Sequence, residues 1–160
     1  MEDFQNKTTA QLLAMHAEIM EELRARGILR SANNPTGDLA EHLFCKAFGW
    51  QIASNSEKGF DATGEQGRRI QIKGRRLHRH SKTRQLSAIR DLDGFDVLAA
   101  VLFDHDYRVL RAALIPPEIV TRRATYVAHT NSHRFMLRDD VWNDAGVEDV
   151  TDRLIAAMAD

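Results

Sequence analysis

The sequence has little cysteine, proline or aromatic content, and it has no long hydrophobic run. A single cysteine, Cys45, excludes an internal disulfide framework and is compatible with a reducing compartment, so we expect a cytoplasmic protein. The longest uncharged apolar run, Val97 to Phe103, is far shorter than the ~20 residues of a membrane-spanning helix. The N-terminal residues carry acids among the apolar positions, unlike a cleaved signal peptide. We therefore expect no membrane partner.

The chain also lacks the composition of a disordered protein. It has 160 residues, of which 43% are hydrophobic and 28% are charged, and these are ordinary values for a globular protein. This length fits one domain, or a domain with a helical appendage, and is sufficient to bury a core.

The net charge is only −1, so neither sign of charge is in large excess. The charges are nevertheless segregated along the chain. Residues 1–67 carry six basic and ten acidic residues, and residues 91–160 carry seven and thirteen. Between them lies a basic block without any acid, which indicates a polyanionic partner, with nucleic acid first. The alternative is a solvated loop of long side chains. The block contains Arg68, Arg69, Lys73, Arg75, Arg76, Arg79, Lys82, Arg84 and Arg90.

Hydrophobic periodicity predicts two helices in the first third of the chain. Residues 8–27 carry an apolar stripe at helical spacing, with a threonine able to cap the start and Gly27 at the end. Residues 35–48 follow an Asn-Pro helix start and stop before Gly49. In this second helix Glu41 lies at the edge of the apolar face, so we expect a partly buried carboxylate.

The rest of the chain alternates between strand and helix patterns. Together they predict an α/β (α+β) fold with a mixed sheet flanked by helices. We divide it into an N-terminal helix (1–30), a core (31–115) and a C-terminal α+β extension packed on the same domain (116–160). We expect strands at 50–54, 60–63, 69–74, 95–103, 107–115 and 133–137, turns at 55–59 and 64–67, and helices at 83–92, 117–123 and 150–158.

Four side chains that could carry chemistry fall on three elements of this prediction, in order along the chain. Glu41 lies on the second helix, Asp61 in the second strand, and Gln71 and Lys73 in the third strand. Because side chains alternate along a strand, Gln71 and Lys73 share one face, and the isoleucines between them pack behind it. Asp61 comes from the neighbouring strand of a predicted hairpin and can reach the same face.

This set suits Mg²⁺-assisted hydrolysis of a phosphodiester bond. Mg²⁺ prefers oxygen ligands and often takes one or two carboxylates together with the substrate phosphate. Asp61 would anchor Mg²⁺ or Mn²⁺, and the Gln71 side-chain carbonyl, the Ile72 backbone carbonyl and Glu41 would be further ligands. Lys73 would orient the attacking water and stabilise developing charge. No other cofactor is expected.

The pattern of Glu41, Phe60-Asp61 and, after nine residues, Gln71-Ile72-Lys73 resembles the PD-(D/E)XK nuclease superfamily. It is most similar to the branch with glutamine in the third motif position, which includes the catalytic domain of Mrr-type restriction endonucleases. The resemblance covers roughly residues 35–103. It implies a restriction endonuclease-like fold around a mixed sheet. The order of elements in that fold is a helix, a three-stranded meander, a second helix and a further strand. The site then lies where the two motif-bearing strands diverge.

The resemblance implies that Asp61 and Gln71 are metal ligands, that Lys73 is the catalytic lysine and that Glu41 is the helix-borne acid. Two positions depart from the family pattern. Phe60 stands in place of the usual proline, which is a mild variation. Gln71 in place of glutamate removes one negative charge, which leaves open a site that binds DNA without cutting it. The alternative is an ordinary lysine beside a glutamine at a sheet edge.

The basic block begins on the strand that carries Gln71 and Lys73, so we expect it to contact phosphates beside the site. It contains few aromatic residues, unlike a stacking platform for single strands. The expected contacts are Arg68, Arg69, Arg75, Arg76, Arg79, Lys82 and Arg84.

Three functions follow as hypotheses. The first is a Mg²⁺-dependent endonuclease of the restriction, defence or repair class, with DNA favoured over RNA. The second is a non-catalytic nucleic-acid-binding module of the same fold, and the third is a protein-interaction or immunity-type partner. A nuclease with one site per chain would need a homodimer or two encounters to cut both strands, and the apolar N-terminal helix is the candidate dimer contact.

Overall fold

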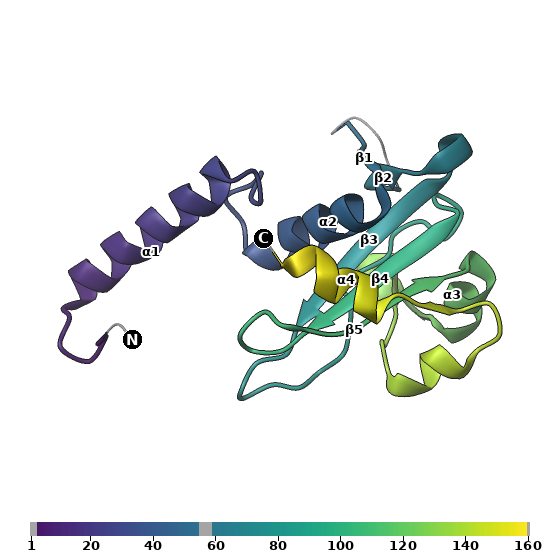
Figure 1. Ribbon diagram of the computed structural model, residues 1–160. Coiled ribbons are helices and arrows are strands. Elements are labelled where there is room, and N and C mark those ends of the chain that lie inside the picture. Colours follow the sequence, from purple (N-terminus) through teal and green to yellow (C-terminus); the bar gives the residue numbers. More distant parts are fainter. Residues whose placement is uncertain (1–2, 55–58, 160) are drawn as a thin grey trace.

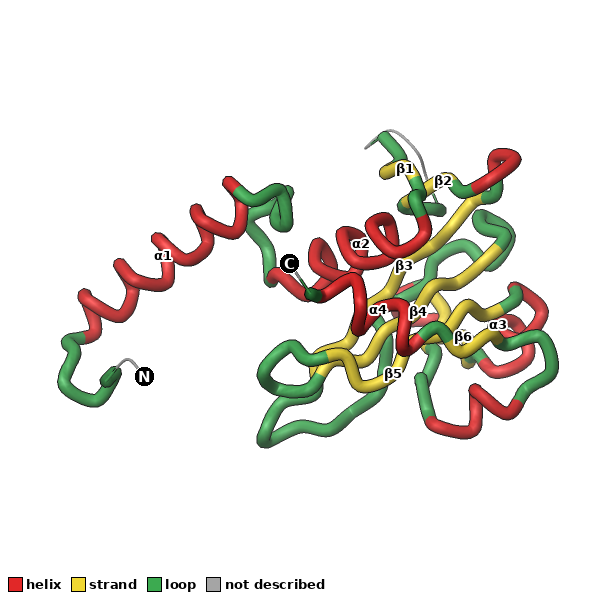
Figure 2. Tube along the Cα trace, in the orientation of Figure 1, coloured by secondary structure: helices red, strands yellow, loops and turns green. Residues whose placement is uncertain are grey.

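The computed structural model describes residues 3–54 and 59–159. A six-stranded mixed sheet runs in the order β1-β2-β3-β4-β5-β8, and β6 and β7 form a separate two-stranded sheet. Helices flank the larger sheet, so the predicted α/β (α+β) class is confirmed (Figure 2). The elements are α1 (Thr9–Ala25), α2 (Pro35–Phe48), β1 (Gln51–Ile52), β2 (Ala62–Thr63), β3 (Arg69–Arg76), β4 (Val97–Phe103), β5 (Val109–Ile115), α3 (Pro117–Arg123), β6 (Thr125–Val127), β7 (Ser132–Arg134), β8 (Glu148–Asp149) and α4 (Thr151–Met158).

The sheet is built on an antiparallel meander of β1, β2 and β3. β3 pairs in parallel with β4, and β4 pairs antiparallel with β5. Every residue of β4 is buried, as expected of an uncharged apolar run that is covered on both faces. The C-terminal residues add β8 at the far edge beside β5.

Two hydrophobic layers sandwich the sheet. α2 and α4 cover one face (Figure 1), and there Leu43 of α2 and Leu154 of α4 belong to one buried cluster with Ile70 and Ile72 of β3. The other face is covered by α3, by residues 135–141 and by the segment 77–96 that connects β3 to β4. Ile70 and Ile72 therefore point towards α2, and the residues between them point the other way.

Local signals place both ends of α2. Asn34 accepts a hydrogen bond from the Thr36 backbone N–H, and Pro35 occupies the first turn. Gly49 ends the helix in the left-handed conformation at φ 69°. The helix then approaches β3 closely at Gly74, where a Cβ would lie 2.9 Å from the Ala40 Cβ. The absence of a side chain at Gly74 thus brings α2 down onto the strand that carries Gln71 and Lys73.

The predicted helix at 83–92 is wrong, and so is the helix after the meander that the resemblance implied. This segment is extended, with isolated bridges from Gln85 to Met136 and from Ile89 to His133. Leu86 and Ile89 are buried as the apolar spacing required. Their backbone N–H groups donate to carbonyls of residues 135 and 133, not to a preceding helical turn.

Several predicted strands are shorter in the structure. The strands expected at 50–54 and 60–63 shrink to β1 and β2, and the one at 133–137 begins at β7 and ends in an isolated bridge. β6 and β8 were not predicted. The turn expected at 55–59 falls mostly on residues 55–58, which lie outside the described residues.

α1 extends away from the rest of the molecule (Figure 1). Thr8 caps its start in a reciprocal capping box with Gln11, as the sequence suggested for this position. None of its residues is buried, and Leu13 and Ile19 are 64% and 55% exposed. Neither α1 nor any other helix in the described part of the chain has the length and hydropathy to cross a membrane.

Candidate functional site

A cleft of about 590 Å³ opens at the edge of β3 and gathers the residues that the sequence pattern singled out. Its walls come from the start of α2, the end of the hairpin, β3 and the segment that follows β3. The lining residues that could carry chemistry are Glu41, Asp61, Gln71, Ile72, Lys73, Arg75, Arg76, His78 and Ser87.

The cleft exists because β2 is much shorter than β3. β2 pairs with β3 only at Arg69 and Ile70, so the following residues of β3 have no strand on that side. The Asp61 backbone N–H donates to the Ile70 carbonyl at 2.8 Å, which fixes the last point of the hairpin. From there the Asp61 side chain reaches the open edge of β3.

Asp61 is held by β3 itself. Its Oδ2 accepts hydrogen bonds from the Gln71 side-chain amide at 2.7 Å and from the Ile72 backbone N–H at 2.8 Å. Burial raises the pKa of the Asp61 carboxyl above its ordinary value of 3.8, against the opposing effects of the Ile72 N–H, the Lys73 charge and the Gln71 amide. The site thus holds a partly buried carboxylate whose charged form is disfavoured by burial and favoured by these three groups.

The same geometry directs two neutral oxygens towards the cleft. Because Gln71 donates through its amide nitrogen, its side-chain carbonyl is left as an acceptor. The N–H and C=O of one strand residue point to the same side, so the Ile72 carbonyl faces the open edge together with its N–H. Gln71, Ile72 and Asp61 therefore supply three different kinds of oxygen at one edge.

Glu41 reaches the cleft from α2, and its side chain is only 18% exposed. Its carboxylate forms an ion pair with the Arg30 guanidinium. Burial raises the pKa of Glu41, opposed by Arg30 and reinforced by the charge of Asp61. The negative charge of Asp61 therefore acts on Glu41 across the cleft.

The sequence interpretation missed Arg30, which lies in the linker between α1 and α2. The backbone N–H groups of Arg30 and Ser31 both donate to Asp38 Oδ2 at 2.9 Å, which fixes the linker against α2. These two hydrogen bonds hold the linker in a position from which the Arg30 guanidinium reaches Glu41. A lone arginine in a polar linker gives no sequence signal for such a contact.

Lys73 is held by the segment that crosses from β3 to β4. Its ammonium donates to the Ala88 carbonyl at 3.1 Å. Burial lowers the pKa of Lys73, the charges of Asp61 and Glu41 raise it, and Arg90 lowers it further. An ammonium has three donors, so the bond to Ala88 leaves two for other partners.

The structure divides the basic block. Two arginines are bound by acids of this chain: Arg69 pairs with Asp96, and Arg84 with Asp139. Arg68 lines a separate hollow together with Trp50 and other residues. Arg68 precedes Lys73 by five residues, which is about 16 Å of extended chain. These three predicted phosphate contacts are therefore not part of the cleft.

Four predicted phosphate contacts lie in or next to the cleft. Arg75 and Arg76 line it, and their guanidinium groups donate to the backbone carbonyls of Thr83 and His105. Arg79 and Lys82 line an adjoining hollow.

In the described part of the chain, no three His, Cys, Asp or Glu side chains form a metal-binding group. The candidate ligands are instead two carboxylates, one amide oxygen and one backbone carbonyl. No protein-family model matches the chain, and a comparison with curated proteins gives no match.

Proposed function

We propose that the protein is a Mg²⁺-dependent endonuclease of the PD-(D/E)XK type that hydrolyses phosphodiester bonds in DNA. The observation that carries the proposal is the single cleft that joins Asp61, Gln71, Lys73 and Glu41. These side chains come from α2, from the residue before β2 and from β3, and the Asp61–Gln71 hydrogen bond of 2.7 Å links the last two segments directly. A restriction, defence or repair role and a cytoplasmic location belong to the same proposal.

The oxygen donors fit a hard divalent cation. Mg²⁺ is commonly held by one or two carboxylates, with waters and substrate phosphate completing its shell, and Mn²⁺ accepts the same ligand types. Asp61 and Glu41 supply the charge, and the carbonyls of Gln71 and Ile72 add neutral oxygens. When bound, the ion would supply Lewis-acid polarisation of the phosphate.

The chain's own residues would contribute orientation and charge. Lys73 presents an ammonium beside Asp61, where it can hold an attacking water and stabilise charge that develops on the phosphate. Burial lowers the pKa of Lys73, so its ammonium holds the proton less tightly than an exposed lysine does. Arg75 and Arg76 would bind neighbouring phosphates from the wall of the cleft.

Metal removal tests the proposed function. The wild-type chain is expected to cut plasmid DNA with Mg²⁺ or Mn²⁺ and to lose the activity in EDTA, with full recovery when Mg²⁺ is restored. Gel electrophoresis of plasmid and linear DNA provides the measurement. Salt-sensitive binding without cleavage under any of these metals would instead indicate the non-catalytic module. Neither binding nor cleavage would indicate the protein-interaction partner.

A duplex has two strands, and the described residues of each chain form one such cleft, so we propose that the enzyme acts as a homodimer paired through α1. An amphipathic helix normally gains its stability by packing its apolar face, yet this 17-residue helix has no buried residue within one chain. A second copy of the same helix would cover Leu12, Leu13 and Ile19.

Leu13→Asp/Ile19→Asp is expected to convert a dimer of twice 18.2 kDa into a single chain, because two charges would enter the apolar contact. Size-exclusion chromatography with light scattering measures the mass. Glu18→Ala, on the opposite side of the helix, is the control and should leave the dimer intact. A wild-type mass of one chain would contradict the proposed dimer.

A further inference from the structure

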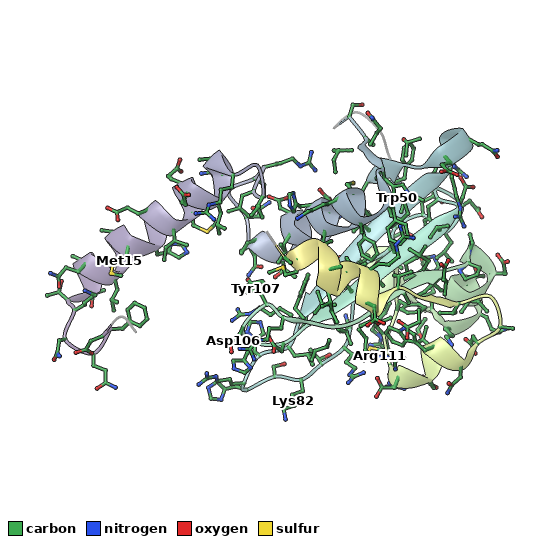
Figure 3. All side chains as sticks on the ribbon, in the orientation of Figure 1. Met15, Trp50, Lys82, Asp106, Tyr107 and Arg111 are labelled. Carbon is green, nitrogen blue, oxygen red and sulfur yellow. The ribbon has the colours of Figure 1, made fainter. Side chains whose placement is uncertain are left out.

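A second hollow of about 420 Å³ continues the cleft beyond the end of β3. His78 lines both, so the two are adjacent. Figure 3 shows Lys82 and Asp106 at the same end of the molecule, and the residues that line this hollow come from the loops that carry these two side chains. Its lining residues are Leu77, His78, Arg79, Lys82, Asp104 and His105.

Arg79 and Lys82 are the available cations of this hollow. Both are exposed, and neither forms a hydrogen bond or ion pair with the part of the chain that the structure describes. This distinguishes them from Arg69 and Arg84, whose guanidinium groups are neutralised by acids. Neither cation therefore has a direct ionic partner among the described residues.

The acids at the hollow are already engaged by their own loop. Asp104 Oδ1 accepts from the backbone N–H groups of Asp106 and Arg108, at 2.8 and 2.9 Å. Asp106 lies 3.2 Å from the His105 ring nitrogen. These contacts hold the loop in shape, and they turn the Asp104 carboxylate towards donors of its own turn. The hollow thus presents Arg79 and Lys82 to an anion.

The loop is also fixed to the cleft wall. Arg76 donates to the His105 carbonyl at 3.0 Å, and its guanidinium stacks 4.5 Å from the centre of the Tyr107 ring. The Leu77 backbone N–H donates to the Phe103 carbonyl at 2.8 Å. These contacts attach the loop that lines one side of the hollow to the end of the strand that carries Lys73.

We infer that this hollow binds the phosphodiester backbone of the same nucleic-acid strand that is cut in the cleft. The inference rests on the proposed function and adds to it the direction in which the substrate leaves the site. From Lys73 to Leu77 is four residues of extended chain, or about 13 Å. With one phosphate per 3.4 Å of axis on each strand, this corresponds to about four nucleotides from the scissile bond.

The test compares Arg79→Ala/Lys82→Ala with wild type in binding to a labelled DNA duplex, measured by fluorescence anisotropy in EDTA so that no cleavage occurs. Loss of two phosphate contacts is expected to weaken binding about tenfold or more at low salt. It should also reduce the slope of log affinity against log salt by about 2. Lys46→Ala/Arg122→Ala is the control, since it removes the same charge from α2 and α3 and should leave the slope unchanged.

A second measurement locates the contact. On end-labelled DNA with Mg²⁺, the wild-type chain should cut poorly within about four nucleotides of one type of strand end, where the hollow would have no phosphate to bind. The double variant should lose this asymmetry.

The outcomes separate the two proposals. If DNA is bound and cut but the double variant matches the Lys46→Ala/Arg122→Ala control, the hollow is not part of the substrate path, and the nuclease function stands. If both double variants weaken binding equally, only net charge matters, and the inference is again wrong. If no variant or wild-type chain binds DNA, both the inference and the proposed function fail.

Discussion

Asp61→Asn is expected to lower the rate of Mg²⁺-dependent DNA cleavage about a thousandfold, which is about 4 kcal/mol of transition-state stabilisation. Asp61 is the carboxylate that β3 holds at the centre of the cleft, by hydrogen bonds from Gln71 and Ile72. An asparagine keeps the size and an oxygen acceptor but removes the charge that a divalent cation requires. The measurement is the initial rate of plasmid cleavage at saturating Mg²⁺.

The same substitution should make the metal-free chain more stable at neutral pH. Burial raises the pKa of the Asp61 carboxyl, so the folded state binds a proton more readily than the unfolded state. Stability therefore falls as the pH rises from the ordinary value of 3.8 through the folded pKa, and the deficit is fully present above the folded pKa. Asp61→Asn removes this deficit, and each 1 kcal/mol regained would raise the melting temperature by about 2–4 °C.

Mg²⁺ should reverse the order of stability. A ligand that binds only the folded state at 100 times its Kd stabilises by about 2.7 kcal/mol, and the wild type should show this gain while Asp61→Asn does not. Thermal unfolding in EDTA and in Mg²⁺ measures both effects. Asp96→Asn is the control, because Asp96 is an exposed carboxylate that pairs with Arg69 outside the cleft. An Asp61→Asn chain that cleaves DNA like wild type would show that the site is assigned wrongly.

The features that the sequence predicted correctly are those set by local signals. Asn34 and Pro35 start α2 and Gly49 ends it, within one turn of the residues that they affect. The alternation of Ile70 and Ile72 with Gln71 and Lys73 follows from the period of a strand and the burial of one face. Both signals can be read without knowing any other part of the fold, and together they indicate which side chains could meet.

The features that the sequence did not predict depend on distant partners. The segment 83–92 has helical spacing, but its backbone hydrogen bonds go to residues 133–137, which no local pattern reveals. Arg69 and Arg84 belong to the basic block, yet each pairs with an acid that lies 27 or 55 residues further along the chain. Composition could locate the positive charge, and only the fold shows which part of it is available to a ligand.

Gln71→Glu is expected to lower the stability of the metal-free chain and to tighten its binding of Mg²⁺. The Gln71 amide lies 2.7 Å from Asp61 Oδ2 and donates to it. A glutamate there would place a second carboxylate against the first and remove the donor. Without metal the free energy of unfolding should fall by about 1–3 kcal/mol, since a buried acceptor loses its partner and like charges meet.

With Mg²⁺ the added charge becomes favourable, because a second carboxylate beside Asp61 would then be available to hold the ion and the negative charge of the ligand set would increase by one. The Mg²⁺ concentration that gives half-maximal stabilisation should fall about tenfold, corresponding to 1.4 kcal/mol of extra binding. Urea unfolding in EDTA and across a Mg²⁺ titration measures both changes on one chain. Gln51→Glu, which adds the same charge at an exposed position of β1, is the control and should alter neither the stability nor the Mg²⁺ dependence.

Equal stability and equal Mg²⁺ dependence in Gln71→Glu and wild type would remove Gln71 from the metal site. A loss of stability without any gain in Mg²⁺ binding would identify the Asp61–Gln71 contact as purely structural and favour the DNA-binding module over the nuclease.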